Sequence, residues 1–236
     1  TKNSLDKYST TSSLSIISKF IKEEITIKKL AKVTAVIAIF ITAILGINFI
    51  EKQIELRKIE QNLVEKNGWL SVTEEKIVNE HGEQMMLRGV NSHHIYSWGY
   101  LYDYNNLKTL KETWGINIFR IAMYTHPEEE GYIKHKHLKN EVKRIVDLCI
   151  ELDLYVIIDW HILYDNNPRI YEKESIEFFN EMSKEYADVP NVIYEICNEP
   201  NGKEVTWDND IKPYAEKIIK TIRKNSPKSI IIVGTP

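Results

Sequence analysis

The sequence has no excess of basic residues and very little cysteine. Its 236 residues include 31 Lys and Arg against 34 Asp and Glu, which gives a formal net charge of −3. Domains that bind nucleic acid usually carry a clustered basic excess, so we predict no nucleic-acid partner. The two cysteines, Cys149 and Cys197, provide neither a disulfide framework nor the spacing of a metal site. We interpret both as small buried hydrophobic residues and expect no cofactor and no metal.

Long uncharged runs are also rare, and residues 33–50 stand out for that reason. This stretch, VTAVIAIFITAILGINFI, has no charged side chain and is long enough to cross a bilayer as a helix. The segment before it is too long for a signal peptide, and no small-residue cleavage site follows Ile50. An uncleaved membrane anchor is therefore favoured over a signal peptide or a buried helix. A slight excess of lysine before the run favours a cytoplasmic N-terminus.

Composition divides the chain into four parts. Residues 1–31 are predicted to be cytoplasmic and partly disordered, because Ser and Thr dominate their first half without apolar periodicity. Residues 32–50 form the predicted transmembrane helix, and residues 51–66 a juxtamembrane helix or stalk. Residues 67–236 are predicted to form a folded α/β domain outside the cell. Since the first residue is Thr rather than Met, we expect the natural chain to begin further upstream.

From residue 67 onward, short apolar runs alternate with amphipathic helical patterns. This alternation predicts a parallel sheet with helical connections. The repeat of roughly 30–40 residues is typical of a (β/α)8 barrel, which needs about 250 residues in all. A β-hairpin with its turn at His81–Gly82 is predicted to come first. The predicted strands are 86–91, 117–124, 155–162, 192–199 and 230–235, and the helices are 106–114, 138–152, 175–186 and 211–222.

Polar residues gather where four of these strands end. In a parallel α/β barrel the carboxyl ends of the strands carry the chemistry. Pro200 and Gly202 prevent the fourth strand from continuing, so Asn198 and Glu199 lie together at the end of a buried strand. The alternative is a simple strand terminator with a solvated glutamate. The four segments are LRGVNSHH (87–94), FRIAMY (119–124), VIIDWH (156–161) and YEICNEPNG (194–202).

Together these segments resemble glycoside hydrolase family 5, which includes many bacterial endo-β-1,4-glucanases. The resemblance extends from about residue 67 to residue 236, and DNNP at 165–168 indicates the bacterial cellulase-like branch. It implies an incomplete TIM (β/α)8 barrel, covering about the first five strands and preceded by a single transmembrane helix. It further implies a retaining glycoside hydrolase that acts on β-glucan polysaccharide.

The resemblance also implies roles for four residues at the strand ends. Glu199 matches the general acid/base, and burial beside another carboxylate would raise its pKa toward the working pH. Asn198 matches the residue that hydrogen-bonds the sugar 2-hydroxyl. Arg120 matches the arginine that keeps the nucleophile ionised, with a structural ion pair as the alternative. His161 matches the active-site histidine of the third strand.

Substrate binding is assigned to aromatic and histidine side chains near the carboxyl ends of the predicted strands. His93 matches a sugar-binding histidine, whereas His94 is as readily interpreted as part of a loop. Tyr124 is predicted to lie near the substrate. Trp98 and Trp207 are candidate platforms on which sugar rings stack, and ordinary packing is the alternative for both.

The sequence departs from the family at the nucleophile. In the family this is a glutamate at the end of a later strand, and no acidic residue here matches it. Asp159 is the nearest candidate, but it precedes His161 by two residues on the same strand face and is predicted to lie deeper. We therefore expect an inactive N-terminal fragment of a glucanase.

The sequence leaves two other functions open and disfavours a third. A non-catalytic cell-surface carbohydrate-binding protein on a decayed barrel remains open, as does a mannanase of the same family. A zinc site is disfavoured because its candidate histidines lack ligand spacing. Those histidines are His93, His94, His135 and His137.

Overall fold

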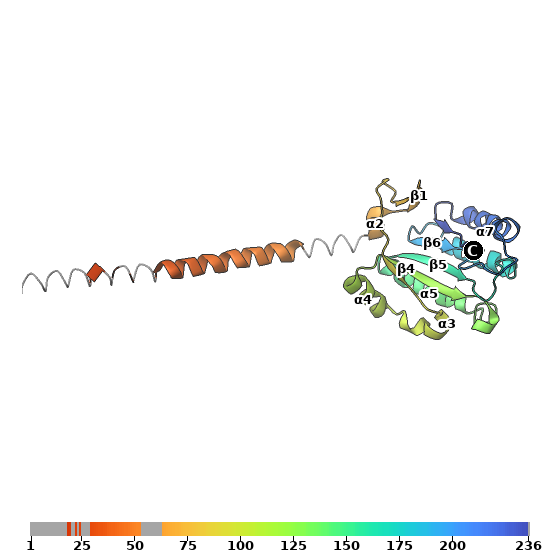
Figure 1. Ribbon diagram of the computed structural model, residues 1–236, viewed down its shortest axis with the longest axis horizontal. Coiled ribbons are helices and arrows are strands. Elements are labelled where there is room, and N and C mark those ends of the chain that lie inside the picture. The colour runs from red at the N-terminus through yellow and green to blue at the C-terminus, as the bar shows by residue number, and fades with distance from the viewer. Residues whose placement is uncertain (1–17, 20–21, 23, 25–28, 53–62, 236) are drawn as a thin grey trace, which may run out of the picture. The chain divides into compact units, whose positions relative to one another are not determined.

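The computed structural model describes residues 18–19, 22, 24, 29–52 and 63–235 (Figure 1). The chain separates into two compact units, Thr1–Lys58 and Ile59–Pro236. The first contains a helix of 24 residues, Lys29–Lys52, and the second contains all the strands found in the described residues. The predicted disorder of residues 1–31 and the predicted stalk at 51–66 fall largely outside the described residues.

The Lys29–Lys52 helix is long and apolar enough to cross a membrane. At 1.5 Å per residue it spans about 36 Å, against about 30 Å for a bilayer core. Large apolar side chains such as Phe40 and Phe49 are exposed on it. A signal sequence near the N-terminus would have the same length and composition, so the helix alone supports a membrane anchor only weakly.

Five parallel strands form one open sheet in the second unit. They are β3 (Gly89–Asn91), β4 (Ile118–Tyr124), β5 (Tyr155–His161), β6 (Val192–Glu195) and β7 (Ile231–Ile232). Their order in the sheet is their order in the sequence, and every neighbouring pair is parallel. The five strands predicted from the sequence are confirmed with shorter bounds. Within the described residues the sheet does not close, which confirms the incomplete barrel.

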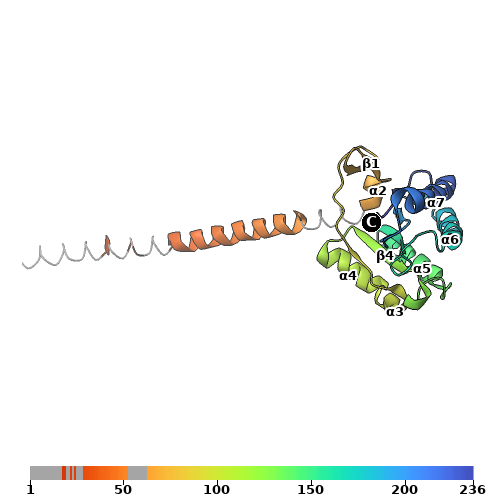
Figure 2. The same ribbon diagram turned by 45° about the vertical axis from the view of Figure 1, so that its right-hand side comes forward.

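Helices connect these strands and lie in an arc around them (Figure 2). The four predicted helices are confirmed. Local residues define their ends. For helix Tyr104–Trp114, the Asp103 side chain accepts from the Asn106 amide at the start, and Gly115 ends the helix with φ 68°. The helices are α2 (Leu63–Asn67), α3 (Ile95–Trp98), α4 (Tyr104–Trp114), α5 (Leu138–Glu151), α6 (Glu172–Glu185) and α7 (Lys212–Asn225).

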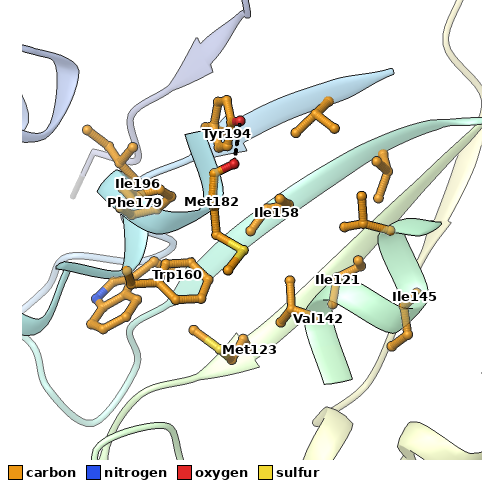
Figure 3. Close-up of a cluster of buried hydrophobic side chains, with 14 of the residues drawn as sticks. Ile121, Met123, Val142, Ile145, Ile158, Trp160, Phe179, Met182, Tyr194 and Ile196 are labelled. Carbon is orange, nitrogen blue, oxygen red and sulfur yellow. Dashed lines mark hydrogen bonds between the residues drawn. The ribbon is translucent and has the colours of Figure 1, made fainter. Parts of the chain in front are cut away.

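The main hydrophobic core lies between the sheet and the helices (Figure 3). Successive strand residues point to opposite faces, so one set of alternate side chains from β4, β5 and β6 meets α5 and α6. Both cysteines belong to this core and are free, as predicted, and burial raises the pKa of each thiol to about 12. The labelled core residues are Ile121, Met123, Val142, Ile145, Ile158, Trp160, Phe179, Met182, Tyr194 and Ile196.

The hairpin prediction is partly wrong. Strands β1 (Ser71–Thr73) and β2 (Lys76–Val78) pair with each other around a turn that includes Glu74 at φ 57°. This turn could not be predicted from the residue types, because glutamate is not a typical turn residue. The predicted reversal at Gly82, φ 79°, does occur, but only one bridge follows it, between β2 and Gln84.

This hairpin segment and α2 cover the amino ends of the strands. The Tyr155 hydroxyl donates to the Gly68 carbonyl at 2.8 Å. The opposite, carboxyl ends of the strands remain available for a functional site. The buried residues at the covered end are Val64, Leu70, Ile118, Tyr155 and Ile193.

Candidate active site

The register of the sheet brings the polar residues of three strands onto the face opposite the helices. Asp159 of β5 is aligned with Glu195 of β6, and Tyr124 of β4 is aligned with His161 of β5. Arg120 lies four residues before Tyr124 and therefore shares this face. Three separate sequence segments are thus combined into one polar surface.

Arg120 is the centre of this surface. Its Nε and Nη2 donate to the two carboxylate oxygens of Glu195, both at 2.7 Å, and Nη2 lies 3.0 Å from Asp159 Oδ2. The guanidinium also donates to the amide oxygens of Asn198 at 2.8 Å and Asn91 at 2.9 Å. Burial alone would lower the pKa of Arg120, but the bond to Glu195 and the nearby carboxylate charges raise it. Arg120 therefore forms ion pairs with Asp159 and Glu195, and its role beside the nucleophile stays a prediction.

Asp159 holds the imidazole of His161. Its Oδ2 lies 2.6 Å from His161 Nδ1, and the Asp159 side chain is completely buried, as its predicted deeper position requires. Burial raises the pKa of Asp159 to about 6, although the hydrogen bond from His161 opposes this shift. With Nδ1 occupied, His161 directs Nε2 to within 3.5 Å of Asn198 Nδ2. The ring of Tyr124 lies 4.4 Å from that of His161.

Asn198 and Glu199 follow β6 but differ in environment. The Asn198 side chain is fixed, because its oxygen accepts from Arg120 and its nitrogen donates to the Ile162 carbonyl at 3.2 Å. Glu199 is exposed, so the expectation of a buried carboxyl beside another carboxylate is not met. Its backbone carbonyl accepts from Asn201 Nδ2 at 2.7 Å. The difference arises because β6 ends at Glu195, four residues earlier than predicted.

The predicted substrate-binding residues are brought together only in part. The ring of His93 lies 6.2 Å from Tyr124 and 6.5 Å from Trp98, so these three line one side of the polar surface. Trp98 is 43% exposed. Trp207 is also exposed, at the start of the helical turn η3 (Trp207–Ile211), and shows no ring contact with the others in the described part of the chain.

Two residues at this surface were missed by sequence reasoning. Glu195 was not assigned a role, although a charged side chain inside a buried apolar strand requires a partner. His94 was interpreted as a loop residue, yet it is buried and its ring stacks 4.5 Å from Tyr124. No signal in the sequence distinguishes His94 from its neighbour His93.

Comparison with known proteins decides the family. The sequence profile described as cellulase (glycosyl hydrolase family 5) matches residues 78–236. The chain belongs to glycosyl hydrolase family 5. The resemblance stated from the strand-end segments is therefore confirmed, and with it the fold as part of a TIM barrel.

Several similar proteins carry endoglucanase names. The chain is 53% identical to Endoglucanase A of Evansella cellulosilytica over 154 residues, which cover 65% of this chain and 31% of that protein. It is 44% identical to Endoglucanase N of Pectobacterium atrosepticum over 195 residues, which cover 83% of this chain and 42% of that protein. This family-5 chain thus spans less than half the length of these two relatives.

Solved structures of similar proteins also include endoglucanase catalytic domains. The catalytic domain of Thermobifida fusca endoglucanase Cel5A is 37% identical and superimposes with a TM-score of 0.69, covering 73% of this chain and 55% of that domain. A variant of that domain was solved in complex with cellotetraose. The part of the barrel described above therefore corresponds to about half of a family-5 catalytic domain.

Proposed function

We propose that residues 67–236 supply the acid/base side of the catalytic site of a retaining endo-β-1,4-glucanase. The observation that carries this proposal is the convergence of the side chains of Arg120, His161 and Asn198 on the side of the sheet opposite the helices, in a family-5 chain. The endoglucanase names of its relatives and the cellotetraose bound by the Thermobifida fusca variant support a β-1,4-glucan substrate.

Glu199 is the general acid/base in this proposal. Cleavage requires a carboxylic acid that protonates the leaving glycosidic oxygen. The exposed side chain of Glu199 leaves it accessible to a polysaccharide that binds across the carboxyl ends of the strands. Arg120 holds the oxygen of Asn198, so in this proposal the amide nitrogen, which also donates to the Ile162 carbonyl, is the group that donates to a sugar 2-hydroxyl.

A retaining mechanism also needs a nucleophilic carboxylate about 5–5.5 Å from the acid. Asp159 is fully buried and Glu195 is 8% exposed, and both are engaged by Arg120. Neither is free to attack a sugar beside the exposed Glu199.

The 236-residue chain, purified free of host glucanases, should therefore not hydrolyse carboxymethylcellulose. Activity that survives repurification and disappears in Glu199→Gln would show that this account of the nucleophile is wrong.

A hybrid barrel tests the role of Glu199 directly. Residues 67–236 would replace the matching part of the Thermobifida fusca domain, which supplies the rest of the barrel. Glu199→Gln keeps the shape of the side chain but removes the transferable proton, so kcat should fall ~10²–10⁴-fold. Glu204→Gln changes an exposed glutamate nearby and serves as the matched control. The loss at Glu199 should be smaller for substrates with a good leaving group.

The same experiment separates the alternatives. If the hybrid binds cello-oligosaccharides and Glu199→Gln leaves turnover unchanged, the surface is a carbohydrate-binding site without a catalytic role. If the hybrid gains activity on mannan relative to the parent domain, a mannanase is the better assignment. Equal loss for good and poor leaving groups in the first step would argue against the acid role.

We further propose that the Lys29–Lys52 helix is a single-pass membrane anchor with residues 67–236 outside the cell. Its length and composition support this, together with an extracellular polymer as substrate. Protease added to intact cells should remove an epitope placed after Glu65 and spare one at the N-terminus. The opposite pattern would reverse the orientation, and a mature protein that begins after Ile50 would identify a cleaved signal sequence.

A further inference from the structure

Three side chains from two loops meet beside the candidate active site. His126 and Glu129 follow β4 around the short turn η2 (Pro127–Glu129), and Asp165 follows β5. Each places a potential metal-ligand atom within 4.8 Å of the other two. Sequence spacing gave no sign of this cluster, because its members lie up to 39 positions apart on separate loops.

Asp165 carries the second observation that points to a ligand. It is 1% exposed, and its Oδ2 accepts a hydrogen bond from the Thr125 hydroxyl. Its Oδ1 is buried and has no hydrogen-bond partner among the residues that the structure describes. A buried carboxylate oxygen without a partner is costly, and such atoms in native proteins call for a bound water, ion or functional role.

We propose that His126, Glu129 and Asp165 bind a divalent cation, and that zinc is the best match. One imidazole with two carboxylates suits zinc better than calcium or magnesium, which prefer oxygen ligands alone. Zinc also neutralises the two negative charges of this cluster. The fourth ligand of a tetrahedral zinc would be water.

The surroundings suit a cation. His126 Nδ1 accepts from the Glu128 amide at 3.2 Å, so His126 Nε2 is the nitrogen left to bind the metal. The Tyr164 amide donates to Glu129 Oε2 at 3.3 Å and holds that carboxylate. In a tetrahedral site, two ligand atoms about 2.1 Å from the zinc lie about 3.4 Å apart, so the ligand atoms, now within 4.8 Å of one another, must move closer together. His126 and Glu129 are only partly buried and can do this by side-chain rotation. A hollow of about 600 Å³ is lined in part by His126 and Tyr164, so one of the three ligands borders open space.

The bound cation would also steady the loop of Glu199. The Asn166 carbonyl, next to Asp165, accepts from the Asn201 amide at 2.9 Å. Asn201 Nδ2 in turn donates to the Glu199 carbonyl at 2.7 Å. The two turns are therefore tied together, and an ion on Asp165 restrains both. Only this consequence rests on the proposed function of Glu199; the binding site does not.

The test measures binding rather than activity. The full chain, without a polyhistidine tag, is purified in detergent, stripped with a chelator and titrated with Zn²⁺ in competition with a zinc indicator. We expect one Zn²⁺ per chain. His126→Gln and Asp165→Asn should each weaken the affinity by at least about 10-fold, since even loss of outer-shell partners costs 10–100-fold.

The matched control is His135→Gln. His135 Nε2 lies 2.6 Å from Glu130 Oε2, so it forms another histidine–glutamate pair close by in the sequence. This variant should bind Zn²⁺ like the wild type. If Asp165→Asn does not fold, the partly exposed His126→Gln decides the outcome. No binding by the wild type, or a loss in His135→Gln equal to that in His126→Gln, would overturn the proposal.

Discussion

Arg120 contacts more of the candidate site than any other residue described here, with bonds to two carboxylates and two amides. Its planar guanidinium reaches both oxygens of Glu195 at once, which the single ammonium of lysine cannot do. The buried charges of Asp159 and Glu195 depend on this geometry. The same contacts that orient Asn198 are therefore also important for stability.

The first prediction concerns Arg120→Lys. The substitution should destabilise the fold by about 3 kcal/mol, because two largely buried carboxylates lose part of their pairing. Urea unfolding of the detergent-solubilised chain measures this. Arg144→Lys changes a more exposed arginine, which pairs with Glu141 and donates to the Tyr102 and Gly99 carbonyls, and should cost less, about 1 kcal/mol. Equal costs for the two variants would mean that the buried network of Arg120 stabilises the fold no more than the exposed contacts of Arg144 do.

The second prediction concerns Asp159 and pH. Burial raises the pKa of Asp159 from 3.8 to about 6, so the folded state binds its proton more tightly than the unfolded state does. Its contribution to stability is therefore greatest at low pH and declines as the pH rises from about 4 to about 6. Asp159→Asn cannot titrate. The unfolding free energy of the wild type minus that of Asp159→Asn should fall across this window and then level off.

A rise of that difference with pH would contradict the prediction. It would mean that pairing with Arg120 and His161 outweighs burial in setting the pKa of Asp159. The comparison with the asparagine variant is necessary because the pKa values of Glu130 and Glu181 are lowered, mainly by hydrogen bonds from lysines, and these groups give the opposite slope.

At the scale of elements, the segment after β7 supports the segment after β6. The Gly234 amide donates to the Cys197 carbonyl at 3.0 Å. A Cβ at Gly234 would lie 2.2 Å from the Asn198 carbonyl oxygen and 2.4 Å from that of Cys197. Both contacts are with backbone atoms, which cannot move aside as a flexible side chain would. Glycine is therefore required here by the close approach of the two segments.

The third prediction follows from this contact. Gly234→Ala should cost about 1–3 kcal/mol of stability and push Asn198 away from Arg120. In the hybrid barrel, a displacement of about 1 Å should lower kcat by roughly 10²-fold. Gly82→Ala is the control, because it strains the backbone at φ 79° but meets no atom within 4 Å. A Gly234→Ala hybrid with normal kcat would show that the position of Asn198 is not critical.

At the scale of the whole molecule, the described sheet has two free edges, β3 and β7, each with a single neighbouring strand. The Ile230 carbonyl accepts from the Tyr194 amide of β6, and the Ile232 carbonyl accepts from the Ile196 amide just after β6. Since successive residues alternate, the backbone groups of Ile231 point to the free edge. Such an edge invites pairing with another chain. The 236-residue chain should therefore associate beyond the level that its membrane helix alone produces.

The fourth prediction tests this edge. Ile231→Pro removes the free backbone donor without altering the bonds to β6, and it should reduce association seen by sedimentation in detergent. Ile231→Val keeps the donor and should associate like the wild type. Joining the chain to the rest of a barrel should have the same effect as the proline. If Ile231→Pro leaves association unchanged, the contact lies elsewhere on the molecule.

Residue types and their spacing were enough to predict the order of strands and helices, the parallel sheet and the polar residues at its carboxyl ends. These properties depend on periodicity and on local breakers such as Pro200, which act over a few residues. The family could be recognised for the same reason, since each strand-end segment is continuous in sequence.

Which of these residues are in contact could not be predicted in this way, because it depends on the three-dimensional fold. Glu195 became the partner of Arg120 because the register aligns β6 with β5 and β4, and a register is a long-range property. Glu199 is exposed because β6 ends early, and Asp165 meets His126 only where two loops converge. Pairing, burial and pKa depend on neighbours distant in sequence, and no local pattern encodes them.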